Sequence, residues 1–117
     1  MKKLFSLKEN HLFNEVLKKG RKFNSDYILV SEYKKIIDSK ESVPKIGISV
    51  PKRLGNAVFR NKQKRQIKAI LYELLKNNKI KQNTLFVIVV KQKFTNQTFL
   101  EKQKILEEIF ERNRNGK

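Results

Sequence analysis

The sequence predicts an α/β fold in which helices pack on a small mixed sheet as a two-layer sandwich. Three observations lead to this prediction. Apolar residues recur at helical spacing within residues 10–19 and 57–77. KIGISV at 45–50 alternates between apolar and small or polar residues, as a strand with one buried face does. LFVIVV at 85–90 is a short run rich in β-branched residues, which is typical of a buried strand.

The first part of the chain predicts one helix and one clear strand. The helix covers residues 10–19 and places on one face Leu12, Phe13, Val16 and Leu17. Gly20 fits the position just beyond its end. Asn10 is suited to cap the helix, and Ser6 with Glu9 forms a competing capping box. Residues 20–26 leave room for a short further strand, and DYILVSEYKKI at 26–36 predicts the first clear one.

The rest of the chain predicts a strand, a long helix, the buried strand and a last helix. Pro51 ends the strand at 45–50, because proline cannot donate to a sheet ladder. The loop KRLGN leads to the helix at 57–77, with Asn56 placed as its N-cap. Thr98 and Glu101 form a capping box for the last helix. Its inward-facing residues are predicted to be Phe99, Leu106, Ile109 and Phe110. The predicted order is therefore α-β-β-α-β-α.

Composition indicates one soluble domain. The 117 residues suit a single domain, 1–117, with ends of about 1–6 and 113–117 expected to be flexible. Cysteine is absent, which excludes disulfides and thiolate metal sites. Lys8 and Glu9 interrupt the apolar start, so no signal peptide is predicted. The longest apolar run, LFVIVV, is too short to span a bilayer. We expect a cytoplasmic protein with no membrane contact.

The formal charge of +17 is concentrated in the middle of the chain. Residues 42–100 hold thirteen Lys and Arg but one acid, Glu73, whereas residues 1–41 hold ten against six and residues 101–117 five against four. A lysine-rich composition alone explains many cations, but it does not explain the loss of acids over the middle segment. The distribution predicts a face that binds a polyanion, and nucleic acid is the usual partner.

The start of the helix at 57–77 carries cations in line with its own apolar stripe. Traced back along the helix, the direction of Ile67, Ile70 and Leu74 meets Arg60, Gln63 and Lys64. Burying unpaired cations is costly, so we expect this sector to be turned away from the core. Arg60, Lys64 and Lys68 are four residues apart, about 6 Å of rise per step, which is close to the phosphate spacing along a strand.

The stretch GNAVFRNKQKRQIK resembles the signature of the bacterial ribonuclease P protein subunit. GISVPKRLGNAV and LKENHLFNEVLKKG are also similar to that family's strand, loop and first helix, so the resemblance covers about residues 7–92. It implies that the catalytic RNA is bound by Arg60, Asn61, Lys62, Lys64, Arg65 and Lys68. Lys62 and Lys68 stand where the family often has arginine, which puts bidentate phosphate contacts there in doubt. Leu17 replaces a common second aromatic residue, and Pro51 is also atypical.

The resemblance implies a left-handed β-α-β crossover, where the physical rule for such units predicts a right-handed one. It also implies partnership with ribonuclease P RNA and with precursor tRNA, whose single-stranded leader would bind a cleft between the first helix and the sheet. No obligate protein partner is inferred. The residues predicted for this cleft are Phe13, Leu17, Lys52, Arg53 and Lys91, with possible help from Tyr27, Tyr33 and Phe94. Phe13 is equally compatible with a place in the core.

The sequence predicts no catalytic residue and no metal site in this chain. Metal-assisted phosphodiester hydrolysis needs clustered carboxylates, and residues 42–100 offer Glu73 alone. His11 is the one histidine, so a histidine pair for acid–base cleavage is excluded. The resemblance assigns the chemistry to RNA with Mg²⁺.

Three alternative functions remain open at this point. The first is a small basic ribosomal or other structural RNA-binding protein without a role in tRNA processing. The second is an RNA nuclease that acts alone, and the third is a DNA-binding helical module. The third is disfavoured because no second helix lies a short turn away from the basic one.

Overall fold

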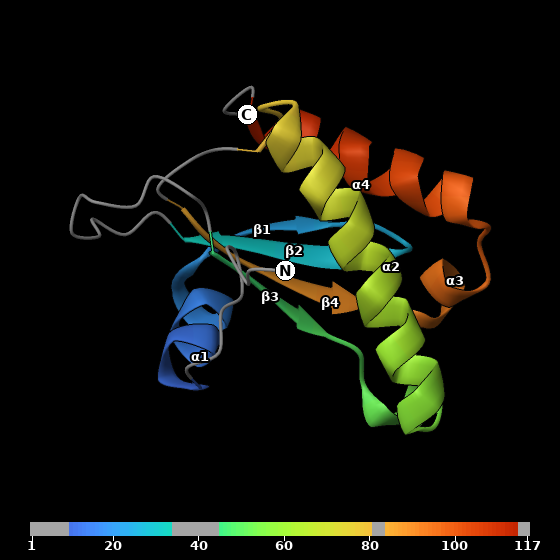
Figure 1. The fold of residues 1–117 in the computed structure, drawn as a ribbon. Coiled ribbons are helices and arrows are strands. Elements are labelled where there is room, and N and C mark those ends of the chain that lie inside the picture. The colour runs from blue at the N-terminus through green and yellow to red at the C-terminus, as the bar shows by residue number, and fades with distance from the viewer. Residues whose placement is uncertain (1–9, 34–44, 81–83, 115–117) are drawn as a thin grey trace.

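A computed structural model of the chain describes residues 10–33, 45–80 and 84–114 (Figure 1). The elements in chain order are α1 (Asn10–Lys19), β1 (Arg21–Asn24), β2 (Ile28–Tyr33), β3 (Lys45–Ser49), the 3-10 turn η1 (Lys52–Leu54), α2 (Ala57–Lys76), β4 (Leu85–Val90), α3 (Gln92–Thr95) and α4 (Phe99–Arg114). This is the mixed α/β fold that the sequence predicts. Of the ends expected to be flexible, residues 1–6 and 115–117 lie outside the described residues, whereas 113 and 114 belong to α4.

The four strands form one mixed sheet in the order β1-β2-β4-β3. β2 is antiparallel to both β1 and β4, whereas β3 and β4 are parallel, with Ile48 paired to Ile88. In Figure 1 both parallel strands run toward the right, and β4 lies above β3. The helix α2, which connects β3 to β4 in the chain, passes in front of the sheet. The β3-α2-β4 connection is therefore left-handed, as the family resemblance implies.

β4 is buried on both faces, and this explains its uninterrupted apolar sequence. Phe86, Ile88 and Val90 belong to the main core together with residues of α2 and α4. Leu85 and Val87 point to the opposite face, where they pack against Val16 of α1. The sheet thus carries α2 and α4 on one face and α1 on the other.

The observed elements agree with the predicted ones to within one or two residues where they are described, and three points need comment. Residues 21–24 form the short further strand that the sequence left open. α3 was not predicted, because a four-residue helix is too short to show an apolar period. The prediction that Phe99 faces inward is wrong, since 43% of it is exposed. Phe99 is the first residue of α4 and lies beyond the part of the helix that covers the core, whereas Leu106, Ile109 and Phe110 are buried.

Candidate nucleic-acid interface

The basic helix α2 begins at a well-defined N-terminus. Asn56 caps it as predicted, because its Oδ1 accepts a hydrogen bond of 2.9 Å from the backbone amide of Phe59. The Phe59 ring lies directly over Gly55, where any Cβ would overlap it. The side chain of Arg60 turns back to this loop, and its Nε donates a hydrogen bond of 3.1 Å to the Gly55 oxygen. The loop and the first turn of α2 therefore form one braced unit.

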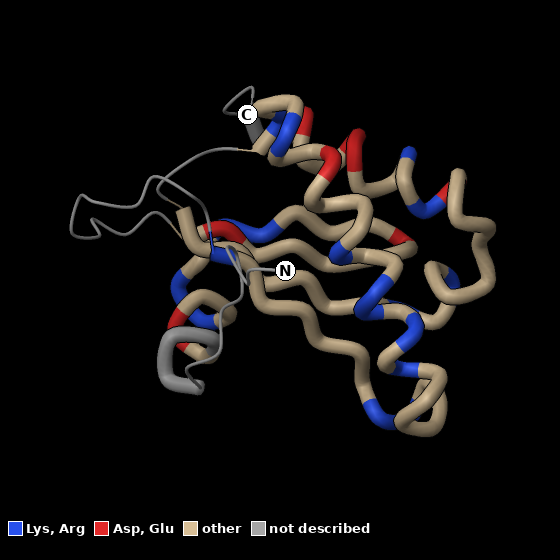
Figure 2. The backbone as a smooth tube through the Cα atoms, viewed as in Figure 1, with Lys and Arg blue, Asp and Glu red and all other residues tan. Residues whose placement is uncertain are grey.

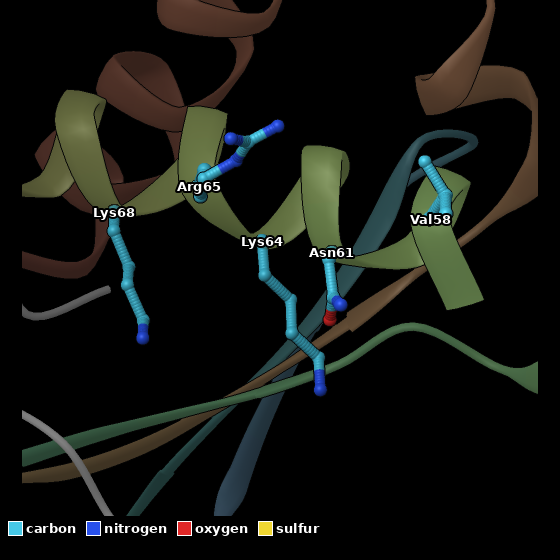
Figure 3. Close-up of a pocket in the computed structure, with 5 residues that line it drawn as sticks. All are labelled: Val58, Asn61, Lys64, Arg65 and Lys68. Atoms are coloured by element: carbon cyan, nitrogen blue, oxygen red, sulfur yellow. The ribbon is translucent and has the colours of Figure 1, made fainter.

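An open hollow of about 440 Å³ lies along the outer side of α2. We call it the cationic hollow, and it is lined by Val58, Asn61, Lys64, Arg65 and Lys68. Figure 3 shows Asn61, Lys64 and Lys68 extending from the same side of the helix, with Arg65 directed elsewhere. Val58 is 77% exposed. Four of the predicted motif residues thus line the hollow, three of them from the same side of the helix.

The cationic hollow has no counter-charge on its own helix until Glu73, near the far end of α2. Figure 2 shows the same pattern, with blue segments along the first turns of α2 and red segments mainly on other elements. Within 10–33, 45–80 and 84–114, the ion pairs formed by lysine involve Lys19, Lys79 and Lys93. The cations of the hollow are therefore available to an external anion.

The expected turn of the Arg60, Gln63 and Lys64 sector away from the core is wrong at Gln63. This residue is 3% exposed and lies on the core face with Ile67, Ile70 and Leu71. The fold accommodates its amide because Lys102 of α4 approaches from the other side of the interface. A long-range partner of this kind is not visible in the local sequence.

The buried amide belongs to a polar group that sequence reasoning missed, which we call the Lys102 cluster. It comprises Lys102, Gln63, Gln66 and Phe94. Lys102 Nζ donates to Gln63 Oε1 at 2.9 Å and to Gln66 Oε1 at 2.6 Å, and it lies 5.5 Å from the centre of the Phe94 ring. Lys102 falls on the apolar stripe of α4, four residues before Leu106, and that position is the signal by which it could have been found.

Lys62 occupies a different side of α2 from the cationic hollow. It is exposed, and it does not line the hollow. Burial lowers the pKa of Lys102, and the positive charge of Lys62 lowers it further. The Arg60-Asn61-Lys62 motif is therefore split in space. Arg60 turns to the preceding loop, Asn61 to the hollow and Lys62 toward α4.

Of the residues predicted for a second binding surface, Leu17 and Tyr33 lie on the face of the sheet that carries α1. Tyr27 packs against the main core instead, and the suggestion that Phe94 assists in binding is wrong, because its ring is fully buried in that core. Leu17 and Val89 are partly buried beside the Val16, Leu85 and Val87 cluster. Phe13 is within α1, but its side chain lies outside the described part of the structure. Its role stays a prediction.

Three predicted cations lie near the C-terminal ends of the parallel strands. Lys52 and Arg53 are exposed in η1 after β3, and Lys91 directly follows β4. Lys91 is tied to the β1–β2 turn, because its Nζ donates at 2.6 Å both to Asn24 Oδ1 and to the Ser25 oxygen. Lys52 and Arg53 are accordingly more accessible than Lys91.

The described parts of the chain contain no cluster of three or more histidine or acidic residues that could hold a metal ion. None of the helices described there is long and apolar enough to cross a membrane.

Comparison with known proteins identifies the family. The family model described as Ribonuclease P matches residues 1–114. The chain belongs to the ribonuclease P protein family. The ribonuclease P protein component of Mycoplasmopsis synoviae is 38% identical over 110 residues, covering 94% of this chain and 90% of the relative. That of Mycoplasma mobile is 36% identical over 117 residues, covering 100% and 96%.

The fold is also that of a ribonuclease P protein. The structure of the Staphylococcus aureus ribonuclease P protein matches with a TM-score of 0.79 and 27% identity, covering 94% of this chain and 95% of that one. In this chain the basic helix α2 connects the parallel strands β3 and β4.

Proposed function

We propose that this chain is the protein subunit of ribonuclease P and assists the ribonuclease P RNA in removing the 5′ leader of precursor tRNA. Membership of the family supports the assignment over a ribosomal or other structural RNA-binding role. Its place of action would be the cytoplasm.

The observation that carries the proposal is the cationic hollow on α2. Lys64 and Lys68 are four residues apart on one helix, and like charges at this spacing destabilise the helix by a few tenths of a kcal/mol. RNA phosphates placed in the hollow would remove that repulsion and release condensed counterions. Asn61 adds an amide that can donate to a phosphate or contact a base edge. We therefore assign the ribonuclease P RNA to this side of the protein.

We assign the chemical step to the RNA. The described residues do not fit a Mg²⁺ site, because this hard cation prefers carboxylate and phosphate oxygens and the basic surface offers amide and cationic groups. RNA phosphates would hold the ions, and the protein's role is to bind and shape the RNA. No step of the reaction is assigned to a side chain of this protein.

We assign the precursor tRNA leader to the face of the sheet that carries α1. Leu17 and Val89 offer apolar contacts there, and Phe13 would stack on a base without regard to its identity. Lys52 and Arg53 are exposed at the strand ends and would guide the leader backbone. Lys91 would contribute its charge while it remains bonded to the β1–β2 turn.

Reconstitution tests the function directly. The protein is mixed with the ribonuclease P RNA of the same organism, and leader removal from precursor tRNA is measured as Mg²⁺ is lowered. We expect the protein to sustain cleavage at Mg²⁺ concentrations at which the RNA alone is inactive. A lysine-rich peptide of equal charge is the control for simple screening. Cleavage by the protein without RNA would support the lone nuclease instead, and RNA binding with no effect on cleavage would support the structural RNA-binding role.

A further inference from the structure

Lys102 joins three helices beneath the RNA-binding surface. It is 3% exposed, and its hydrogen bonds to Gln63 and Gln66 link α4 to α2. Its contact with Phe94, which is fully buried, adds α3. Its own helix is fixed at that point, because the Lys102 amide donates to the Thr98 oxygen at 2.9 Å. Thr98 and Glu101 exchange both hydrogen bonds of a capping box.

Burying the Lys102 cluster between α2 and α4 costs free energy. A buried lysine with neutral amide partners gives up the solvation of a full charge, and no carboxylate accepts from it in the bonds described. Apolar residues of similar size would fill the same space without that cost. Hydrogen bonds are directional, however, whereas apolar contacts allow neighbouring packings of nearly equal free energy. A buried polar group is thus suited to select one arrangement of two helices.

Helical geometry relates the cluster to the cationic hollow. Gln63 and Gln66 occupy the side of α2 away from the hollow. In the sequence they are interspersed with three residues that line the hollow, Asn61, Lys64 and Arg65. A rotation of α2 that breaks the bonds to Lys102 would therefore carry the hollow around the helix axis. The second polar contact with α4, between Lys79 and Glu107 at 2.8 Å, is partly exposed and lies beyond the other end of α2. Partly exposed pairs of this kind constrain a helix weakly.

We infer that Lys102, through Gln63 and Gln66, is a positioning residue that fixes the rotation of α2 and so aims the cationic hollow at the RNA. The inference rests on the proposed function, because it assumes that RNA binds the hollow. Lys102 itself does not touch RNA in this scheme. It determines how well the phosphate-binding side chains match their targets, not how many phosphates are bound.

Replacing the three polar residues of the Lys102 cluster by apolar ones separates an effect on the orientation of α2 from an effect on stability. The variant carries Gln63→Leu, Gln66→Leu and Lys102→Met, so no buried amide is left without a partner. Lys104→Met is the matched control, because Lys104 is exposed on the same helix and its loss changes the net charge equally. Affinity for the ribonuclease P RNA is measured from low to high salt, together with the melting temperature of each protein.

We expect the triple variant to melt at or above the wild-type temperature and to bind RNA about tenfold more weakly than Lys104→Met at every salt concentration. The slope of log affinity against log salt should be the same for both, because the number of contacted phosphates does not change. Affinity equal to that of the control would overturn the inference. A slope reduced by about one relative to the control would also overturn it, since Lys102 would then act as a phosphate-binding charge.

Two further measurements keep the result decisive. If the triple variant does not fold, Gln66→Leu is compared by the same two criteria, because it removes one bond to Lys102 and leaves Gln63 paired. The cysteine-free chain also allows Ala69→Cys, exposed on α2, to carry an iron chelate that cleaves nearby RNA. We expect the cleavage sites to spread or shift in the triple variant, and unchanged sites would count against positioning. If wild type and Lys104→Met both fail to bind RNA, the proposed function itself fails.

Discussion

The hydroxyl of Ser31 on β2 donates a hydrogen bond of 2.5 Å to the backbone oxygen of Val16 on α1. The same oxygen accepts the amide of Gly20 at 2.9 Å, so the end of the helix and the strand share one acceptor. A Cβ on Gly20 would overlap both Ser31 Oγ and the Val16 oxygen. Glycine is therefore required here for close approach of α1 to the sheet.

Gly20→Ala should loosen α1 from the sheet. Forcing a methyl group against fixed backbone should lower the free energy of unfolding by about 1–3 kcal/mol. Circular dichroism melts give this value, and Asn14→Ala, on the exposed side of α1, is the control. An unchanged melting temperature for Gly20→Ala would show that α1 can move away from β2 without cost.

Arg65→Ala should weaken binding to ribonuclease P RNA and lower its salt slope by about one, with little change in stability. Lys68→Ala should do the same. The control is Lys76→Ala, since this exposed residue is on α2 but does not line the hollow. Salt slopes that stay at the wild-type value for Arg65→Ala and Lys68→Ala would place the RNA elsewhere.

Arg60→Ala should differ from both of these variants. It removes the hydrogen bond to the Gly55 oxygen, so it should cost about 1 kcal/mol of stability as well as RNA affinity. Thermal melts and binding isotherms on the same samples separate the two effects. Loss of affinity with unchanged stability would mean that Arg60 contributes to RNA binding but not to the stability of the fold.

Phe13→Ala should weaken binding of precursor tRNA relative to mature tRNA, because the leader is present in the precursor alone. A lost base stack is worth about 1–3 kcal/mol. Phe99→Ala removes a partly exposed ring on another helix and is the matched control. Equal losses for the two tRNAs would assign Phe13 to the core.

Anions should stabilise the folded protein. Its charge of +17 repels itself over distances shorter than the Debye length, which is about 10 Å at 0.1 M salt. An anion that binds the folded surface adds stability by mass action, so millimolar nucleotide should raise the melting temperature more than chloride at matched ionic strength. The rise should shrink in a Lys64→Ala, Lys68→Ala double variant. A melting temperature indifferent to anions would mean that these cations are already neutralised within the fold.

Much of the fold follows from local sequence patterns. β4 matches the LFVIVV run at both ends, and α2 ends one residue before its predicted limit. Asn56 and the Thr98–Glu101 pair act as caps because capping depends on residues three apart. Amphipathic spacing shows that α1 buries one face but not which face of the sheet receives it. That choice depends on contacts such as Val16 with Val87, far apart in the chain.

The site was less predictable than the fold for the same reason. The cationic hollow is formed by one helix, so its residues could be gathered from the sequence. Gln63 and Lys102 are 39 residues apart, and each is a polar residue on the apolar stripe of its own helix, with nothing in its own segment to show its partner. Their pairing depends on how α4 crosses α2, which no local pattern specifies.

The placement of α1 and α2 on opposite faces of the sheet has a consequence for turnover. If the RNA subunit is held on the α2 side and the leader on the α1 side, the two ligands do not compete for the same atoms. A cleaved leader can then dissociate and a fresh transcript can enter while the ribonucleoprotein stays assembled. In that arrangement the strands between the two faces would separate permanent assembly from transient exchange, so that one particle could process many transcripts in succession.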